Sequence, residues 1–221
     1  NQGIVVLTHE SPDQKYANYD VEMIDNVKFG EKALELLVEV MGTSGKFAVY
    51  VGSLTVPAHN IWADAALRLA KEKYPDLVQV ADRFPVSEDQ HAARQTALEL
   101  LTAHPDIKGF LCFGSQGAPG AAQAVREKGL QDKVAVIGTT SPAQAAQFIL
   151  DGSMDYSILW DPGEAAYVMV YLAKLILDGQ EDQIYDGMMI PGIGEAKLEG
   201  MNVLFDRPLI VTKDNVGDYD F

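Results

Sequence analysis

The chain has 221 residues, of which 48% are hydrophobic and 22% are charged, and its formal net charge is −15. This composition is typical of a globular protein, and the negative charge argues against nucleic acid and anionic membrane surfaces as partners. No apolar run in the sequence reaches the roughly 18 residues of a membrane-spanning helix. Cys112 is the single cysteine, which excludes an internal disulfide. Its apolar neighbours favour a buried thiol over a reactive one.

The first part of the chain predicts one strand and one helix. Residues 3–7 form an apolar run of strand length that ends shortly before Glu10. Residues 12–25 are polar, and we expect them to form a connection. Residues 26–41 carry apolar side chains at helical spacing, so they predict an amphipathic helix.

From residue 46 onward, a short apolar strand is followed each time by a helical pattern. The expected strands are 46–51, 78–84, 110–113, 134–139 and 155–159. The expected helices are 58–74, a helix from the cap Ser87 to about Ala103, a helix opened by Pro119, a helix from 142 to about 151, and 163–177. This alternation predicts a parallel sheet with helices on both faces. After Tyr185 we expect short strands, turns and no helix.

The segment Gly109–Val125 holds the clearest unit, a strand, a glycine-rich turn and a helix. In open α/β sheets, ligands bind outside the carboxyl ends of the strands, near the helix N-termini. Ser115 and Gln116 are expected at that position. The same turn is also compatible with an ordinary connection whose glycines serve only the backbone.

Catalytic signatures are missing from the sequence. It contains no Gly-x-Ser-x-Gly, no P-loop, no His-Glu-x-x-His and no Cys-x-x-Cys. No two of the four histidines share the spacing of metal ligands. We therefore predict no enzyme activity, no catalytic residue, no metal site and no cofactor.

Hydrogen-bonding side chains instead follow several predicted strands. They are Glu10, His59, Asn60, Ser115, Gln116 and Thr140, together with Trp160 and Asp161 at the end of a fifth strand. Carboxylates, amides and hydroxyls bind adjacent hydroxyl groups, and an indole packs on the C–H face of a sugar ring. This set suits a neutral polyhydroxylated ligand. Three structural alternatives stay open: Trp160 in the core, His59 facing water, and Asp161 as the cap of the next helix.

Several stretches carry a resemblance to a known family. They are IVVLTHES, MIDNVKFGEKALELL, LLTAHPDIKGFLCFGSQGAPGAAQAV, VAVIGTTSP, GSMDYSILWDPGEAAYVMVYLAKLILDG and PLIVTKDNVGDYDF. Together the chain resembles the periplasmic sugar-binding proteins of ABC importers, of the ribose-binding-like type I group. The most similar branch holds the rhamnose-binding and autoinducer-2-binding proteins. The resemblance implies an α/β fold with a doubly wound parallel sheet in each of two lobes.

The resemblance also implies a domain organisation in which the N-terminal lobe is incomplete. Residues 1–25 are expected to be a remnant of that lobe, and residues 26–159 to form the C-terminal lobe. Residues 160–187 would return to the N-terminal lobe, and residues 188–221 would form a hinge crossing and the C-terminal tail. In this architecture the ligand is held between two lobes that close by hinge bending, so we expect this chain alone to bind sugar weakly.

Residue by residue, the resemblance to the autoinducer-2 branch is partial. Pro119 and Ala121 match two of its ligand contacts, and Glu10 stands in place of its first-loop aspartate. Ala58 and His59 replace its adjacent Asp-Gln pair, which removes one carboxylate and one amide. Thr140 replaces the aspartate of the wider family. A deoxyhexose or pentose is therefore favoured over autoinducer-2 and over ribose itself.

The resemblance implies a solute-binding protein that captures a small neutral sugar and delivers it to the membrane permease of an ABC importer. It would be located in the periplasm, or outside a Gram-positive cell on a lipid anchor, and would be a monomer at full length. An autoinducer-2 receptor of the same branch and the sugar-sensing domain of a repressor stay as alternatives.

Overall fold

The computed structural model describes residues 3–12 and 14–221, and it divides into two compact units. The smaller unit comprises Asn1–Asp25 and Trp160–Leu209, apart from Asn1, Gln2 and Asp13, which lie outside the described residues. The larger unit comprises Asn26–Leu159 and Ile210–Phe221. The third change of unit falls after Leu209, within the segment 188–221 that is expected to contain a crossing, and residues 189–195 form a hairpin within the smaller unit.

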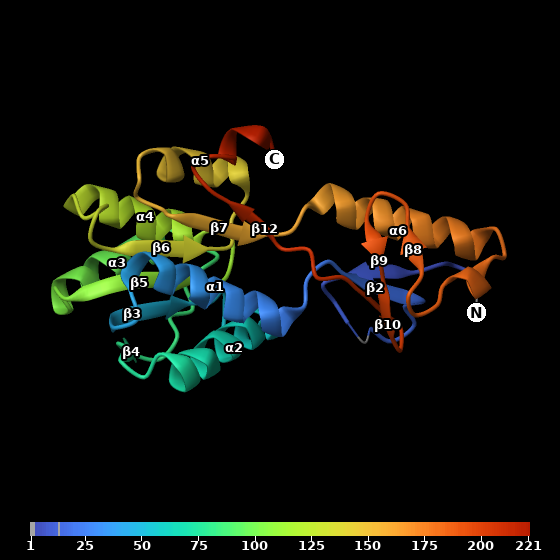
Figure 1. Ribbon diagram of the computed structural model, residues 1–221, viewed down its shortest axis with the longest axis horizontal. Helices are drawn as coiled ribbons and strands as arrows, with labels where there is room; N and C mark the ends of the chain where they lie inside the picture. The colour runs from blue at the N-terminus through green and yellow to red at the C-terminus, as the bar shows by residue number, and fades with distance from the viewer. Residues whose placement is uncertain (1–2, 13) are drawn as a thin grey trace. The chain divides into compact units, whose positions relative to one another are not determined.

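A six-stranded sheet forms the centre of the larger unit, with the strand order β12-β7-β6-β5-β3-β4 (Figure 1). The strands are β3 (Gly45–Tyr50), β4 (Leu77–Gln79), β5 (Ile107–Cys112), β6 (Ala135–Gly138), β7 (Tyr156–Leu159) and β12 (Leu209–Val211). From β4 to β7 all neighbouring strands pair in parallel. The predicted parallel sheet is thus confirmed.

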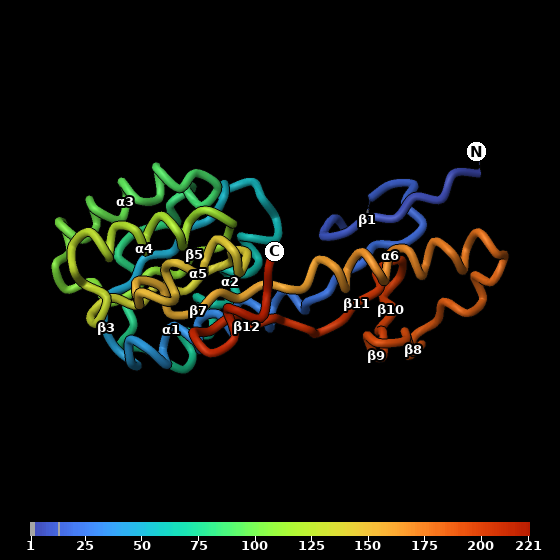
Figure 2. The backbone as a smooth tube through the Cα atoms, turned by 90° about the horizontal axis from the view of Figure 1, so that it is seen from above, coloured from blue at the N-terminus to red at the C-terminus, as the bar shows by residue number. Residues whose placement is uncertain are grey.

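Five helices cover this sheet in two layers. They are α1 (Asn26–Met41), α2 (Pro57–Lys73), α3 (Gln90–Ala103), α4 (Gly117–Lys128) and α5 (Pro142–Leu150). Helix α1 packs against α2 on one face, while α4 packs against both α3 and α5 on the other (Figures 1 and 2). Because parallel strands need crossover connections, this arrangement buries both faces of the sheet and explains its continuous apolar strands.

Helix α3 begins two residues later than the sequence suggests. Ser87 was the predicted cap, but the side chain of Asp89 accepts a hydrogen bond from the backbone N–H of Ala92. Ser87 is fully buried, and its hydroxyl donates to the carbonyl oxygen of Gly114 at 3.3 Å. Serine and aspartate are both good helix caps. Because the Ser87 hydroxyl is bound to Gly114, Asp89 caps the helix instead. The shift moves Glu88 out of the helix and into the loop.

The smaller unit contains a four-stranded sheet with the order β1-β2-β11-β10 and one long helix, α6. Its elements are β1 (Leu7–His9), β2 (Tyr19–Glu22), α6 (Pro162–Leu177), β8 (Met189–Ile190), β9 (Gly194–Glu195), β10 (Lys197–Glu199) and β11 (Asn202–Leu204). Helix α6 contacts β1 and β2 and shares their apolar core (Figure 2). A short 3₁₀ helix, Glu181–Gln183, follows α6 in this unit. A second one, Val216–Asp218, lies in the larger unit and corrects the expectation of no helix after Tyr185.

Two expectations for the first residues are wrong. The first strand is Leu7–His9 rather than residues 3–7, because its pairing with β2 begins at Leu7, which lies opposite Tyr19. Residues 12–25 are not a plain connection, since they include β2, whose acidic side chains Asp20 and Glu22 are buried. With two carboxylates in four residues, β2 lacks the continuous apolar run that marks the predicted buried strands.

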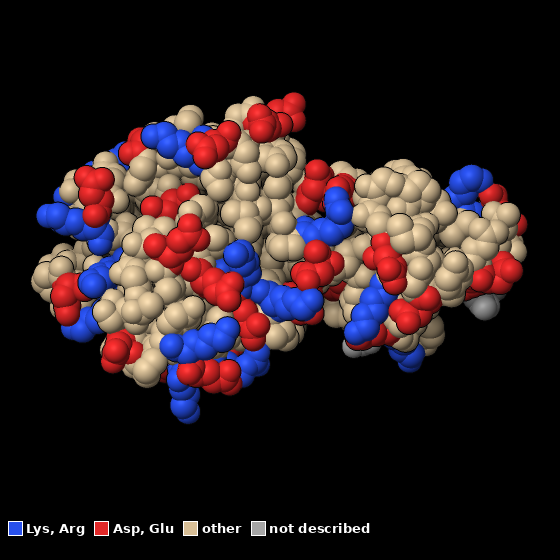
Figure 3. All heavy atoms as spheres, viewed as in Figure 1, with Lys and Arg blue, Asp and Glu red and all other residues tan. Residues whose placement is uncertain are grey.

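The surface carries mixed charge, and the described helices stay within ordinary lengths. On the face drawn in Figure 3, acidic and basic side chains alternate over both units without a basic patch. None of the helices in residues 3–12 and 14–221 combines the length and apolarity needed to cross a membrane. The prediction that Cys112 is buried is confirmed, and burial raises the pKa of its thiol.

We expect Gly30→Ala to destabilise the larger unit. A Cβ atom at Gly30 would lie 2.2 Å from the carbonyl oxygen of Trp62, so α1 and α2 would have to move apart. Overpacking of this kind costs about 1–3 kcal/mol of unfolding free energy. We expect the upper end of that range, because the atoms in the way are backbone atoms of Trp62. This cost exceeds the gain of about 1 kcal/mol in helix propensity from replacing glycine by alanine. Urea unfolding should show the loss.

The matched control is Gly217→Ala in the same unit, where a Cβ atom would meet nothing within 4 Å. That variant should stay within about 0.5 kcal/mol of the wild type. Equal stability of the two variants would contradict the close approach of α1 and α2.

Candidate functional site

The candidate site lies where the order of strands in the larger sheet reverses. From β3 the chain runs through α2 to the edge strand β4, and it then returns through α3 to β5 on the other side of β3. The connections that leave β3 and β5 therefore diverge to opposite faces of the sheet. A crevice at the carboxyl ends of two such strands is the usual ligand position in open α/β sheets.

A chain of side-chain hydrogen bonds crosses this position. The hydroxyl of Ser115 donates to Oε2 of Glu88 at 3.0 Å, and Nε2 of Gln116 donates to the Ser115 oxygen at 3.2 Å. The same Gln116 amide is 3.4 Å from Oε1 of Gln144, which also accepts from the Thr140 hydroxyl at 3.0 Å. The loops after β5 and β6 and the loop before α3 thus converge on one polar cluster.

His59 extends the cluster from the first turn of α2. Its Nδ1 accepts the backbone N–H of Gly52 at 3.1 Å, and its Nε2 lies 3.9 Å from Oε1 of Glu88. Burial lowers the pKa of His59, and the Glu88 carboxylate opposes that shift only in part. Because Nδ1 is an acceptor, the neutral imidazole carries its proton on Nε2, toward Glu88.

Asn60 has a structural role in this geometry. Its amide nitrogen donates to the carbonyl oxygens of Ser53 and Val56, and its Oδ1 accepts from the guanidinium of Arg83 at 2.7 Å. Arg83 also pairs with Asp64. The side-chain amide of Asn60 is therefore engaged in holding the loop before α2, and its predicted ligand contact gains no support from these bonds.

Pro119 and Ala121 lie within the packing of α4. Both residues are buried, and Ala121 has no exposed surface at all. Thr140 is also buried, but its hydroxyl belongs to the polar cluster. In the larger unit, Pro119 and Ala121 therefore expose little or no side-chain surface to a ligand. Their ligand contacts, which the resemblance implied, stay predictions.

The smaller unit has an acidic group of its own at the end of β1. Oδ1 of the buried Asp20 accepts from the Thr8 hydroxyl at 2.6 Å, while its Oδ2 has no hydrogen-bond partner among the residues that the structure describes. His9 lies between the carbonyl oxygen of Val21, 2.6 Å from Nδ1, and Glu10, 3.8 Å from Nε2. Burial, and after it the charge of Asp20, raises the pKa of Glu10 to about 7.

Trp160 and Asp161 occupy the end of β7 and the start of α6. The indole of Trp160 packs against the core of the smaller unit and meets the His9 ring edge-on, with 6.1 Å between centroids. Oδ1 of Asp161 accepts the backbone N–H groups of Gly163 and Glu164, so it caps α6. The structural alternatives for both residues are thus present, and their ligand contacts stay predictions.

Sequence reasoning missed Glu88 and Gln144 as members of the cluster. A helix capped at Ser87 would place Glu88 in its first turn, and Gln144 falls within the predicted helix that begins at residue 142. Ser115 is among the predicted hydrogen-bonding residues, and in the structure its hydroxyl donates to Glu88. The available signal for Glu88 was the next residue, Asp89, which is itself a residue type that caps helices. A helix capped at Asp89 leaves Glu88 in the preceding loop.

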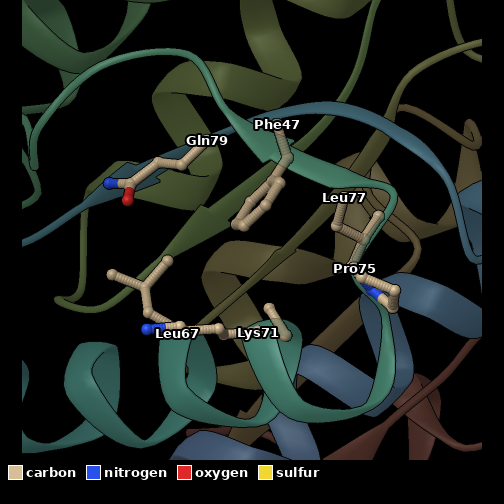
Figure 4. A pocket seen from close by; sticks show the side chains of 7 residues that line it. Phe47, Leu67, Lys71, Pro75, Leu77 and Gln79 are labelled. Carbon is tan, nitrogen blue, oxygen red and sulfur yellow. The ribbon is translucent and has the colours of Figure 1, made fainter.

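Two other kinds of site gain no support from the geometry. Within the part of the chain that the structure describes, no group of three or more His, Cys, Asp or Glu side chains could hold a metal ion. A cavity of about 330 Å³ lies between α2 and the strands β3 and β4 (Figure 4). Its lining is mostly apolar, with Lys71 and Gln79 as its polar members, so it lacks the acceptor set of the cluster.

A parallel sheet with a polar cluster at its switch point places the larger unit in the class of α/β ligand-binding folds. The chain belongs to the family described as "Periplasmic binding protein domain", whose sequence profile matches residues 1–181. This finding confirms the predicted family and the type I α/β fold.

Individual proteins support the same assignment. The D-allose-binding periplasmic protein of Escherichia coli is 27% identical over 170 residues, which are 76% of this chain and 51% of that protein. LsrB from Clostridium saccharobutylicum in complex with AI-2 superposes with a TM-score of 0.84 at 26% identity, covering 99% of this chain and 75% of LsrB. A solute-binding protein from Clostridium phytofermentas with bound L-rhamnose gives 0.83 at 22% identity, covering 99% and 73%. The chain spans about half the length of the curated relatives that it matches.

We expect Glu10→Gln to change how stability depends on pH. The pKa of Glu10 is about 7 in the folded protein against 4.5 in the unfolded chain, so the folded state holds this proton more tightly. The resulting stabilisation is complete below pH 4.5 and is lost as the pH rises through 7. Relative to the wild type, Glu10→Gln should therefore gain stability between pH 5 and pH 8, as measured by urea unfolding.

The control is Glu195→Gln, which removes an exposed carboxylate from the same unit. That variant should show no gain over the wild type between pH 5 and pH 8. The same result for Glu10→Gln would contradict the raised pKa of Glu10 near the buried Asp20.

Proposed function

We propose that this chain belongs to a solute-binding protein that captures a small neutral sugar and delivers it to the permease of an ABC importer. The observation that carries the proposal is the polar cluster at the switch point of the larger sheet, in a chain of the periplasmic binding protein family. Relatives named for D-allose and ribose, and a structural neighbour with bound L-rhamnose, support a sugar as the ligand.

The cluster is chemically suited to hydroxyl groups. The Glu88 carboxylate accepts two or more hydrogen bonds, the Gln116 and Gln144 amides both donate and accept, and His59 donates from Nε2. A sugar offers adjacent hydroxyls that can each donate and accept. The sugar hydroxyls can replace the hydrogen bonds that the side chains of the cluster make to one another. The polar atoms that become buried when the sugar binds therefore keep a hydrogen-bond partner.

Within the sugars, we propose a deoxyhexose or a pentose, delivered in the periplasm or at the outer surface of a Gram-positive cell. A small-molecule binding role without catalysis follows from the relatives, which are binding proteins by name. The full-length protein would act as a monomer.

An autoinducer-2 receptor is the second candidate. The LsrB structure in complex with AI-2 has a TM-score of 0.84 to this chain, which supports that ligand class. The residues at positions 58 and 59 oppose it, because Ala58 and His59 stand where that branch has an adjacent Asp-Gln pair, so one carboxylate and one amide are missing.

We expect the intact protein, including any residues that flank this chain, to bind one neutral sugar with micromolar affinity, about −8 kcal/mol. Isothermal titration against D-allose, D-ribose, L-arabinose, L-rhamnose and autoinducer-2 would identify it. His59→Ala should weaken that binding about tenfold or more, since it removes a donor and leaves the Gly52 N–H without its acceptor.

The control variant is His91→Ala, which removes an exposed histidine from α3 in the same unit. It should bind with wild-type affinity. Tight binding of autoinducer-2 and of no sugar would favour the second candidate, and the absence of binding to every compound would contradict the proposed function.

A further inference from the structure

Glu88 occupies space that two glycines leave free. A Cβ atom at Gly52, just after β3, would lie 2.9 Å from Cγ of Glu88. A Cβ atom at Gly114, just after β5, would lie 2.7 Å from its Oε1. Both distances are shorter than real Cβ contacts, and a Cβ atom at Gly52 would also lie 2.8 Å from Nδ1 of His59, while one at Gly114 would lie 2.9 Å from Cβ of Ser87. The two glycines therefore leave room for Glu88 together with its neighbours His59 and Ser87 at the switch point.

The partners of this carboxylate are neutral. Its Oε2 accepts from the Ser115 hydroxyl, and its Oε1 faces Nε2 of His59, whose lowered pKa favours the neutral imidazole at pH 7. Among the residues that the structure describes, the ion pairs of Glu88 include no lysine or arginine. Arg83 is held by Asn60 and Asp64.

The carboxylate is also open to a ligand. The side chain of Glu88 is 51% exposed, although its stem packs between the two glycine positions. A charged acceptor fixed in position, with neutral partners and an open face, attracts hydrogen-bond donors and repels anions. A purely structural Glu88 would hold Ser115 and His59 in place, a role that an uncharged acceptor of the same shape can also fill.

We propose that Glu88 determines the charge selectivity of the site: it binds a hydroxyl or ammonium donor of the sugar, and it excludes sugars that carry a carboxylate or phosphate. This inference rests on the proposed function and names the class of sugar that the site accepts. Neutral sugars and amino sugars bind, whereas uronic acids and sugar phosphates do not.

The test compares Glu88→Gln with the wild type in the intact protein by calorimetry. The probes are D-allose, D-ribose and L-rhamnose, followed by the hexuronate and the hexuronamide whose ring hydroxyls match those of the sugar that binds best. Uronate and uronamide have nearly the same shape and differ in charge. In the wild type, we expect the uronate to bind about 100-fold more weakly than the uronamide. In Glu88→Gln, the neutral sugar should weaken about tenfold, and the difference between uronate and uronamide should fall below about tenfold.

Glu99→Gln is the matched control, because it removes the same charge from the same segment of chain. Glu99 lies in α3, about 13 Å along the helix axis from Gln90, and its carboxylate accepts from Gln95. It should leave every affinity unchanged. Urea unfolding of Glu88→Gln, which retains an acceptor for Ser115, would show that the variant is folded.

The outcomes separate the two proposals. If none of the neutral sugars binds the wild type, the proposed function fails and the selectivity inference fails with it. If a neutral sugar binds but Glu88→Gln keeps its affinity within twofold, Glu88 is structural and the inference alone is overturned. A uronate that equals its uronamide in the wild type, or that stays excluded in Glu88→Gln, also overturns the inference.

Discussion

The close packing of Glu88 against Gly52 and Gly114 is the contact on which the larger unit's polar cluster depends. It brings together the ends of β3 and β5 and the loop before α3. Backbone hydrogen bonds from Ser87 to Val51 and from Gln116 to Ser87 fix these segments in the same place. Because the loops are tied by main-chain bonds, the side-chain bonds of the cluster are free to exchange partners with a ligand at little cost to the fold.

The carboxylates of Glu10 and Glu88, one in each unit, have opposite surroundings. In the smaller unit, Glu10 lies near the buried Asp20, and the resulting rise of its pKa to about 7 allows it to carry a proton near neutrality. In the larger unit, Glu88 keeps an open face and neutral partners. A protonated Glu10 can donate a hydrogen bond as well as accept one, whereas an ionised carboxylate only accepts. Hydroxyl groups, which do both, are compatible with either environment.

The sequence was sufficient for the elements whose signal is local. Helix α1 matches its predicted bounds, because its apolar residues repeat over four turns, and the alternation of strands and helices predicts the parallel sheet. Long-range contacts decided the remainder. Asn60 accepts a hydrogen bond from Arg83, 23 residues away, and Ser87 donates to Gly114 instead of capping a helix. Strand β2 was missed because Asp20 is buried through a bond to Thr8, a partner that no local pattern reveals.

The same reasoning explains why the site was only half predicted. Residues that follow an apolar strand directly, such as Ser115 and Thr140, can be placed at a carboxyl end from the sequence alone. Glu88 does not follow a strand directly: the predicted strand 78–84 is only β4, Leu77–Gln79, and an eight-residue loop separates Glu88 from it. The position of Glu88 depends on bonds that join this loop to β3 and β5. A residue in such a loop acquires its role from the backbone that surrounds it. The glycines at positions 52 and 114 leave room for Glu88 beside His59 and Ser87, and Gly114 also has a φ of +125°, which favours glycine without reference to Glu88.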